Sequence, residues 1–118
     1  MVERVVGGDA TAVVAFNDQM ALGVIAGLRD RGVSVPGDIS VVGFDDVPMA
    51  AMVAPPLTTI SMPTGEAGTI AVDMLGQGPA SQELFGTLVL RHSSGPVSRG
   101  RASVAAARGR RASGVDHA

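Results

Sequence analysis

Two pairs of adjacent polar residues have types and positions suited to chemistry: Asn17 with Asp18, and Asp45 with Asp46. Each pair directly follows a short apolar run, "TAVVAF" before the first and "ISVVGF" before the second. Short carboxylate and carboxamide side chains donate or accept hydrogen bonds in fixed directions, so they suit hydroxyl-rich or amide-rich small molecules. The pattern predicts a binding site for a small polar molecule.

A phenylalanine precedes each pair, Phe16 in the first case and Phe44 in the second, and the chain contains only three aromatic residues. Two of three aromatics in equivalent places indicate apolar surface against which a ligand could stack. A purely structural alternative stays open. In it, Asn17 or Asp18 caps a helix, Asp46 caps another, and both phenylalanines lie in the core.

An enzymatic site is a third alternative, since Asp18, Asp45 and Asp46 could bind a hard cation or act as an acid–base pair. No His, Lys or further carboxylate completes such a motif, and His92 and His117 lie far apart. The sequence has no nucleophile elbow and no phosphate-binding glycine loop. The lack of Cys excludes disulfides, zinc-thiolate sites and thiol catalysis. We therefore expect no catalytic residue, no metal site, no cofactor and no enzymatic activity.

The elements that position the two pairs form a strand–helix–strand unit. Residues 11–16 predict a strand buried on both faces, and residues 39–44 predict a second strand. Between them, a helix is expected to begin near Asp18 and to end at Gly32. Its predicted buried face comprises Met20, Ala21, Val24, Ile25 and Leu28. Because such units are parallel, both polar pairs should lie at the same edge of the sheet.

The following segment continues the alternation of strands and helices. Residues 57–62 predict a third strand, Pro63 begins a helix that ends near Gly76, and residues 83–93 predict a fourth strand. Arg91 is expected to be a surface or salt-bridging residue. The whole indicates an α/β fold with a parallel sheet and flanking helices.

Charge divides the chain into an acidic body and a basic tail. Residues 1–96 carry four Arg and ten acids, a net charge of −6, whereas residues 97–118 carry five Arg and one acid, a net charge of +4. The tail lacks a core-forming stripe, so we expect it to be disordered and solvated, with phosphate binding as the minor alternative.

No apolar run approaches the roughly 20 residues of a membrane span, and no signal sequence is visible. We expect a cytoplasmic protein without membrane contact.

The string "TAVVAFNDQMALGVIAGLRDRGVSVPGDISVVGFDD", followed by "PPLTTISMP" and "LVLRHSS", resembles the closing third of LacI/GalR-type transcriptional regulators. The resemblance runs from about residue 11 to residue 94. It implies a partial periplasmic-binding-protein-like fold in which residues 1–62 belong to the C-terminal lobe. Residues 63–90 would then pack in the N-terminal lobe.

The resemblance also implies roles for single residues. Asn17 and Asp45 would hydrogen-bond the effector, commonly a sugar or a purine, and Phe44 would line or support the pocket. Phe16 remains a candidate from its position before the first polar pair alone. The helix after the first pair and the segment after the second would contribute to a homodimer interface. The residues expected there are Leu22, Ala26, Met49, Met52 and Val53.

Compared with the family, the sequence starts near the end of the effector-binding domain. We therefore expect a truncated ligand-sensing domain whose helix-turn-helix is absent from this chain, so that operator DNA would be bound only through the missing portion. Two alternatives remain: a fragment of a sugar-binding transport protein of the same fold, and a remnant without function.

Overall fold

The computed structural model describes residues 2–78 and 80–98. Along the chain its elements are α1 Val2–Gly7, β1 Ala12–Val14, α2 Asp18–Asp30, β2 Ser40–Val42, the 3-10 helix η1 Pro48–Ala51, β3 Thr59–Ser61, α3 Thr64–Asp73 and β4 Thr87–Val89. Apart from its first two residues, the predicted tail, residues 97–118, lies outside the described part of the chain.

The predicted strand–helix–strand unit is confirmed. Strands β1 and β2 pair in parallel, with Val13 opposite Val41, and α2 connects them. Asn17 caps α2 at its N-terminus, and Gly32 follows its end with a φ of 72°. A positive φ at this position suits glycine, which has no Cβ to clash with the backbone.

The core lies between α2 and the strands. Ala21, Val24, Ile25 and Leu28 of the helix are buried together with Val41 of β2 and Leu57 before β3. The prediction that Met20 belongs to this face is wrong, because the first turn of α2 leaves its side chain exposed. The helix otherwise buries the stripe that its spacing of apolar residues predicts.

The prediction that the first strand is buried on both faces is also wrong. Val14 of β1 is 77% exposed. Within the described residues β1 pairs only with β2, so it is an edge strand, and α2 packs mainly on β2. The apolar, β-branched run at residues 11–16 therefore indicated a strand but did not determine how many other strands pair with it.

The first helix, α1, was not indicated by the sequence pattern. It packs on α2, where the Glu3 carboxylate pairs with the Arg31 guanidinium at 2.5 Å. The described part of the chain contains no helix that is both long enough and apolar enough to cross a membrane.

A second pair of strands leads away from this unit. A single parallel bridge joins Val42 to Thr58 before β3, and β3 pairs antiparallel with β4, with Ile60 opposite Leu88. The predicted fourth strand over residues 83–93 is thus shorter than expected, and it runs antiparallel to its neighbour.

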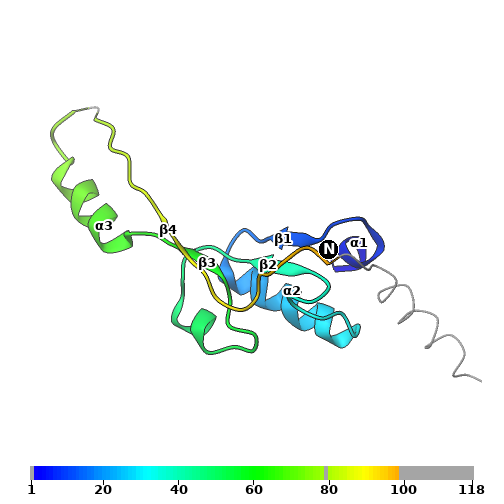
Figure 1. Ribbon diagram of the computed structural model, residues 1–118. Coiled ribbons are helices and arrows are strands. Elements are labelled where there is room, and N and C mark those ends of the chain that lie inside the picture. The colour runs from blue at the N-terminus through cyan, green and yellow to red at the C-terminus, as the bar shows by residue number, and fades with distance from the viewer. Residues whose placement is uncertain (1, 79, 99–118) are drawn as a thin grey trace, which may run out of the picture.

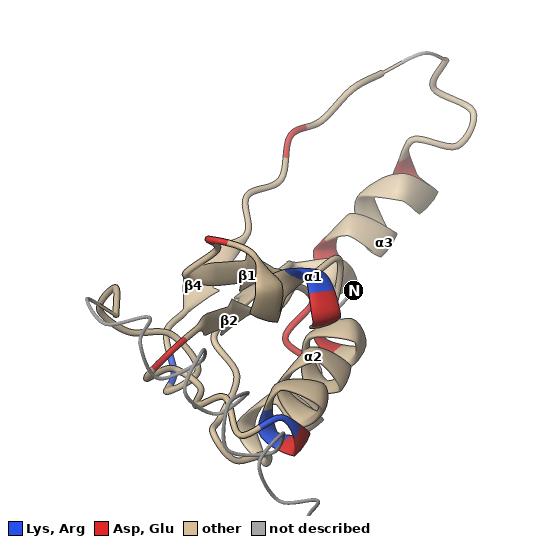
Figure 2. Cartoon of the chain, turned by 90° about the vertical axis from the view of Figure 1, so that its right-hand side faces the viewer, with Lys and Arg blue, Asp and Glu red and all other residues tan. Residues whose placement is uncertain are grey.

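Helix α3 lies between β3 and β4 in sequence and at a distance from the other helices in space (Figure 1). We call residues 63–90 the arm and residues 2–62 the core unit. None of the residues of α3 is buried. The charged residues of the arm are all acidic, namely Glu66, Asp73 and Glu83 (Figure 2).

Candidate functional site

The carboxyl ends of the strands bring the two polar pairs to one edge of the core unit. The Asp18 N–H donates to the Phe44 carbonyl at 2.9 Å, which joins the loop after β1 to the loop after β2. The Asp45 N–H donates to the Ile60 carbonyl of β3, also at 2.9 Å. We call residues 16–18 and 43–47 the rim. Ligands of open parallel sheets bind at this edge.

Asn17 has the cap role that the structural alternative predicted. Its backbone is extended, and its side-chain Oδ1 accepts a hydrogen bond from the Met20 N–H at 2.9 Å. Within the described part of the chain, its side-chain amide NH₂ makes no hydrogen bond. Capping therefore uses the acceptor of Asn17 and leaves its donors for a ligand.

Asp18 is fully buried and turned into the core unit. Its Oδ2 accepts from the Val47 N–H at 2.9 Å, and its Oδ1 accepts from the Thr59 hydroxyl at 2.5 Å. Gly43 makes room for this carboxylate, because a Cβ there would lie 2.1 Å from Asp18 Oδ1. Asp18 is therefore a structural acceptor that solvent does not reach.

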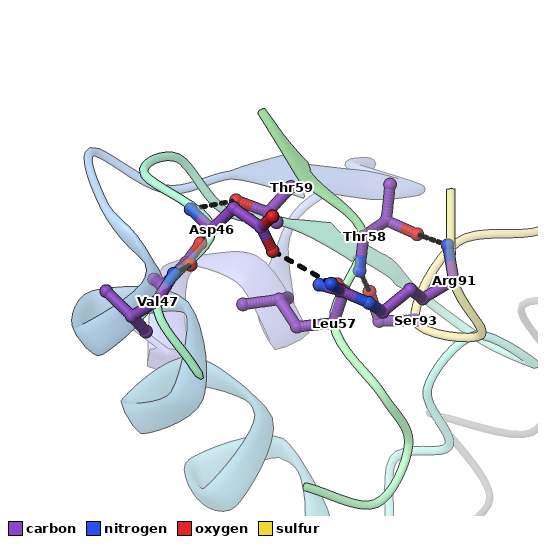
Figure 3. Close-up of polar contacts among 8 residues, drawn as sticks. Asp46, Val47, Leu57, Thr58, Thr59, Arg91 and Ser93 are labelled. Carbon is purple, nitrogen blue, oxygen red and sulfur yellow. Dashed lines mark hydrogen bonds and ion pairs between the residues drawn. The ribbon is translucent and has the colours of Figure 1, made fainter. Parts of the chain in front are cut away.

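In the second pair, too, one side chain is held by contacts within the chain and the other is free. Asp46 lies in an ion pair with Arg91, whose Nη2 donates to Asp46 Oδ1 at 2.8 Å (Figure 3). The alternative in which Asp46 caps a helix is wrong: Val47 occupies the N-cap position of η1, and no side chain caps that helix. Asp45 is exposed, and its carboxylate has no hydrogen bond or ion pair with the residues that the structure describes.

This division also removes the basis for an acid–base or cation site made from three carboxylates. Asp18 is occupied by two donors and Asp46 by Arg91, so only Asp45 is available. Among residues 2–78 and 80–98, no three His, Cys, Asp or Glu side chains are grouped so that they could hold a metal ion.

The two phenylalanines lie on the surface of the rim. Phe16 is 83% exposed and Phe44 is 37% exposed. The alternative that places both in the core is therefore wrong. Exposed aromatic surface beside free polar groups is a common composition of small-molecule sites.

The residues expected at a dimer interface are all at least partly exposed. Met49 and Met52 in and after η1 are largely exposed, and Ala26 of α2 is half-buried. Leu22 and Val53 are also half-buried and pack against the core.

Sequence reasoning missed the polar residues that support the rim from β3 and from the segment after β4. Ser93 Oγ donates to the Val41 carbonyl at 2.6 Å and accepts from the Thr58 N–H at 2.8 Å. Arg91 Nη1 donates to the Leu57 carbonyl at 3.0 Å, so its expected salt-bridging role is confirmed and extended (Figure 3). Only the hydroxyl pairs "TT" and "SS" in the sequence signalled these contacts.

Comparison with known proteins places this geometry in a family. The profile of the periplasmic binding protein-like domain matches residues 2–94. The HTH-type transcriptional regulator MalR of Streptomyces coelicolor is 46% identical over 105 residues, covering 81% of this chain and 30% of the relative. This chain therefore spans about 30% of the length of that relative, which is named as a regulator and not as an enzyme.

Many solved structures share the fold, including the following two. A LacI family transcriptional regulator from Enterococcus faecium with bound ribose superposes with a TM-score of 0.68 at 31% identity, covering 82% of this chain and 39% of that one. The lac repressor dimer bound to operator and the anti-inducer ONPF gives a TM-score of 0.69 at 38% identity, covering 79% and 35%. The chain therefore belongs to the periplasmic binding protein-like domain family, in the form found in the effector-binding domains of LacI/GalR regulators.

Proposed function

We propose that this chain forms part of the ligand-sensing domain of a LacI/GalR-type transcriptional regulator and that its rim binds a sugar or a related small metabolite. One observation carries the proposal: of the four polar residues at the rim, Asn17 and Asp45 retain free hydrogen-bonding groups. Asp18 and Asp46 are occupied by contacts within the chain.

The two free groups are complementary to a hydroxyl. The Asn17 amide donates and the Asp45 carboxylate accepts, and a sugar hydroxyl does both. Phe16 and Phe44 offer exposed apolar surface to the carbon-bound hydrogens of a sugar ring. The ribose in the Enterococcus faecium structure supports a sugar over a nucleobase, which becomes the second ligand class to test.

The proposal extends to assembly and to DNA. The lac repressor structure is a dimer bound to its operator, and by analogy we place a homodimer interface at Leu22, Ala26, Met49, Met52 and Val53. Operator DNA would be contacted by parts of the relatives that this chain does not span. The arm would pack in the N-terminal lobe, and a regulator of transcription would act in the cytoplasm, beside DNA.

The two other interpretations receive less support. The relatives reported above are named as transcriptional regulators, which disfavours a transport protein of the same fold. If the chain is a remnant without function, its rim should bind none of the ligands. The binding experiment is designed to distinguish that outcome from the proposal.

Amide NMR spectra of the chain, recorded during titration with D-ribose, D-glucose and adenosine, test the proposal. We expect one of the sugars to shift the rim amides. Asp45→Asn is expected to weaken binding about tenfold or more, because a hydrogen bond to a charged group contributes about 1.5–3 kcal/mol. Asp73→Asn, at the end of α3, is the matched control and should bind as the wild type does.

Asn17→Ser separates binding from capping, because serine also caps helices but lacks the amide NH₂. We expect it to lose affinity for the sugar while keeping its stability. Shifts by adenosine alone would move the ligand class to nucleobases. No shift by any of the three compounds would contradict the proposal.

A further inference from the structure

The buried carboxylate of Asp18 holds the backbone of the loop that follows β2. It accepts the Val47 N–H directly at 2.9 Å and the Thr59 hydroxyl at 2.5 Å. The same Thr59 hydroxyl oxygen accepts the Asp46 N–H at 3.4 Å. One carboxylate therefore fixes two consecutive amides, the second through the Thr59 hydroxyl.

The loop held in this way has an unusual backbone. Asp45 and Asp46 are the described non-glycine residues with positive φ, at 107° and 54°. L-residues seldom adopt such angles, and these conformations persist only where the surroundings hold them. The contacts that hold the loop are the bonds to Asp18 and Thr59, the Asp45 N–H bond to Ile60 and the Asp46 ion pair with Arg91.

We propose that Asp18 and Thr59 are positioning residues for ligand recognition: they keep Asp45 in the left-handed conformation that presents its carboxylate outward. This inference rests on the proposed function, in which Asp45 accepts from a sugar hydroxyl. It assigns to the second residue of the "ND" pair a role distinct from that of the first. Asp18 acts through the amides of Asp46 and Val47, which directly follow Asp45, and the ligand does not touch it.

Amide hydrogen exchange on the whole chain without sugar tests the positioning alone. In the wild type, the Val47 amide should exchange as slowly as that of Ala15, which donates to the Val42 carbonyl at 2.8 Å. Thr59→Val should speed exchange at Asp46 and Val47 on the order of tenfold, because a bonded hydroxyl is lost. Thr59→Ser should restore protection.

A matched control is Thr69→Val, which removes a hydroxyl bonded to the Gly65 carbonyl within α3 and should leave the rim amides unchanged. Fast exchange of the Val47 amide in the wild type, with the Ala15 amide protected, would overturn the proposal. That measurement requires no variant to fold.

Titration with D-ribose and D-glucose then tests the connection to recognition. Thr59→Val should weaken sugar binding on the order of tenfold, while Thr59→Ser and Thr69→Val should bind nearly as the wild type does. Full affinity in Thr59→Val would overturn the recognition role alone. If the wild type binds adenosine alone, the same variants are compared with adenosine. If it binds neither sugar nor adenosine, the proposed function and the recognition role both fail, whereas the exchange experiment still decides the positioning.

Discussion

The core unit and the arm are both rich in apolar residues, but they differ in burial. The buried apolar side chains of the described residues all fall between Ala15 and Leu57. In the arm, the large apolar side chains are mostly exposed, including Val72, Leu75, Phe85, Leu88 and Leu90. Hydrophobic composition thus favours burial but does not provide the surface against which a side chain is buried.

The two regions meet at a polar junction. Ser93, after the arm, is buried and donates to the Val41 carbonyl, while the Val41 N–H donates to the Ser93 carbonyl at 2.8 Å. Thr58, before the arm, donates its N–H to Ser93 Oγ. The arm therefore leaves and rejoins the core unit at a fixed place, although α3 itself buries none of its residues.

The largest expected difference between the regions is in the free energy of unfolding that is lost when a leucine of each is replaced by alanine. Leu28 is 0% exposed and Leu75 is 77% exposed. Leu28→Ala should lower the free energy of unfolding by about 2–5 kcal/mol, because it opens a cavity in the core. Leu75→Ala should change it by less than about 0.5 kcal/mol. Urea unfolding measures both, and equal losses would contradict the division into two regions.

Gly43→Ala probes the packing around the buried carboxylate. Its Cβ would lie 2.1 Å from Asp18 Oδ1 and 2.9 Å from Leu57 Cδ2, so the neighbours must move. We expect a loss of about 1–3 kcal/mol, the usual cost of overpacking. Thermal unfolding measures the loss. A variant as stable as the wild type would show that the neighbours of Gly43 move at little cost in free energy.

The N-termini of the two long helices offer a smaller contrast. Asn17 caps α2 with its side chain, whereas Pro63 occupies the N-cap position of α3 and no side-chain cap is present there. Asn17→Ala should destabilise the chain by about 1 kcal/mol, and Asn17→Ser by only a few tenths, because serine also caps. Urea unfolding of the two variants gives the difference. Equal losses would mean that the cap contributes little to stability.

The smallest expected effect on global stability lies in the arm. A Cβ at Gly68 in α3 would meet nothing within 4 Å. Gly68→Ala should increase helicity, since alanine favours a helix interior by about 1 kcal/mol over glycine. Global stability should change by less than about 0.5 kcal/mol, because α3 buries nothing. Circular dichroism and urea unfolding separate the two. If global stability rose together with helicity, the result would show that the arm and the core unit unfold together.

Local sequence determined much of the core unit. The apolar spacing of α2 and the stop at Gly32 predicted its position, and its first residue, Asp18, agrees with the structure. The apolar runs on either side predicted two parallel strands, as observed. These features depend on neighbours within a few residues along the chain, which is the range over which helical and strand periodicity applies.

The tertiary structure decided which member of each polar pair remains free. Asp18 is occupied by Thr59, which is 41 residues away, and Asp46 by Arg91, which is 45 residues away. No periodicity connects residues so far apart, so the sequence placed four polar residues at one edge without separating Asn17 and Asp45 from their neighbours. The exposure of β1 and of the arm has the same physical reason: burial requires a partner surface, and the local sequence that forms a strand or a helix does not specify that partner.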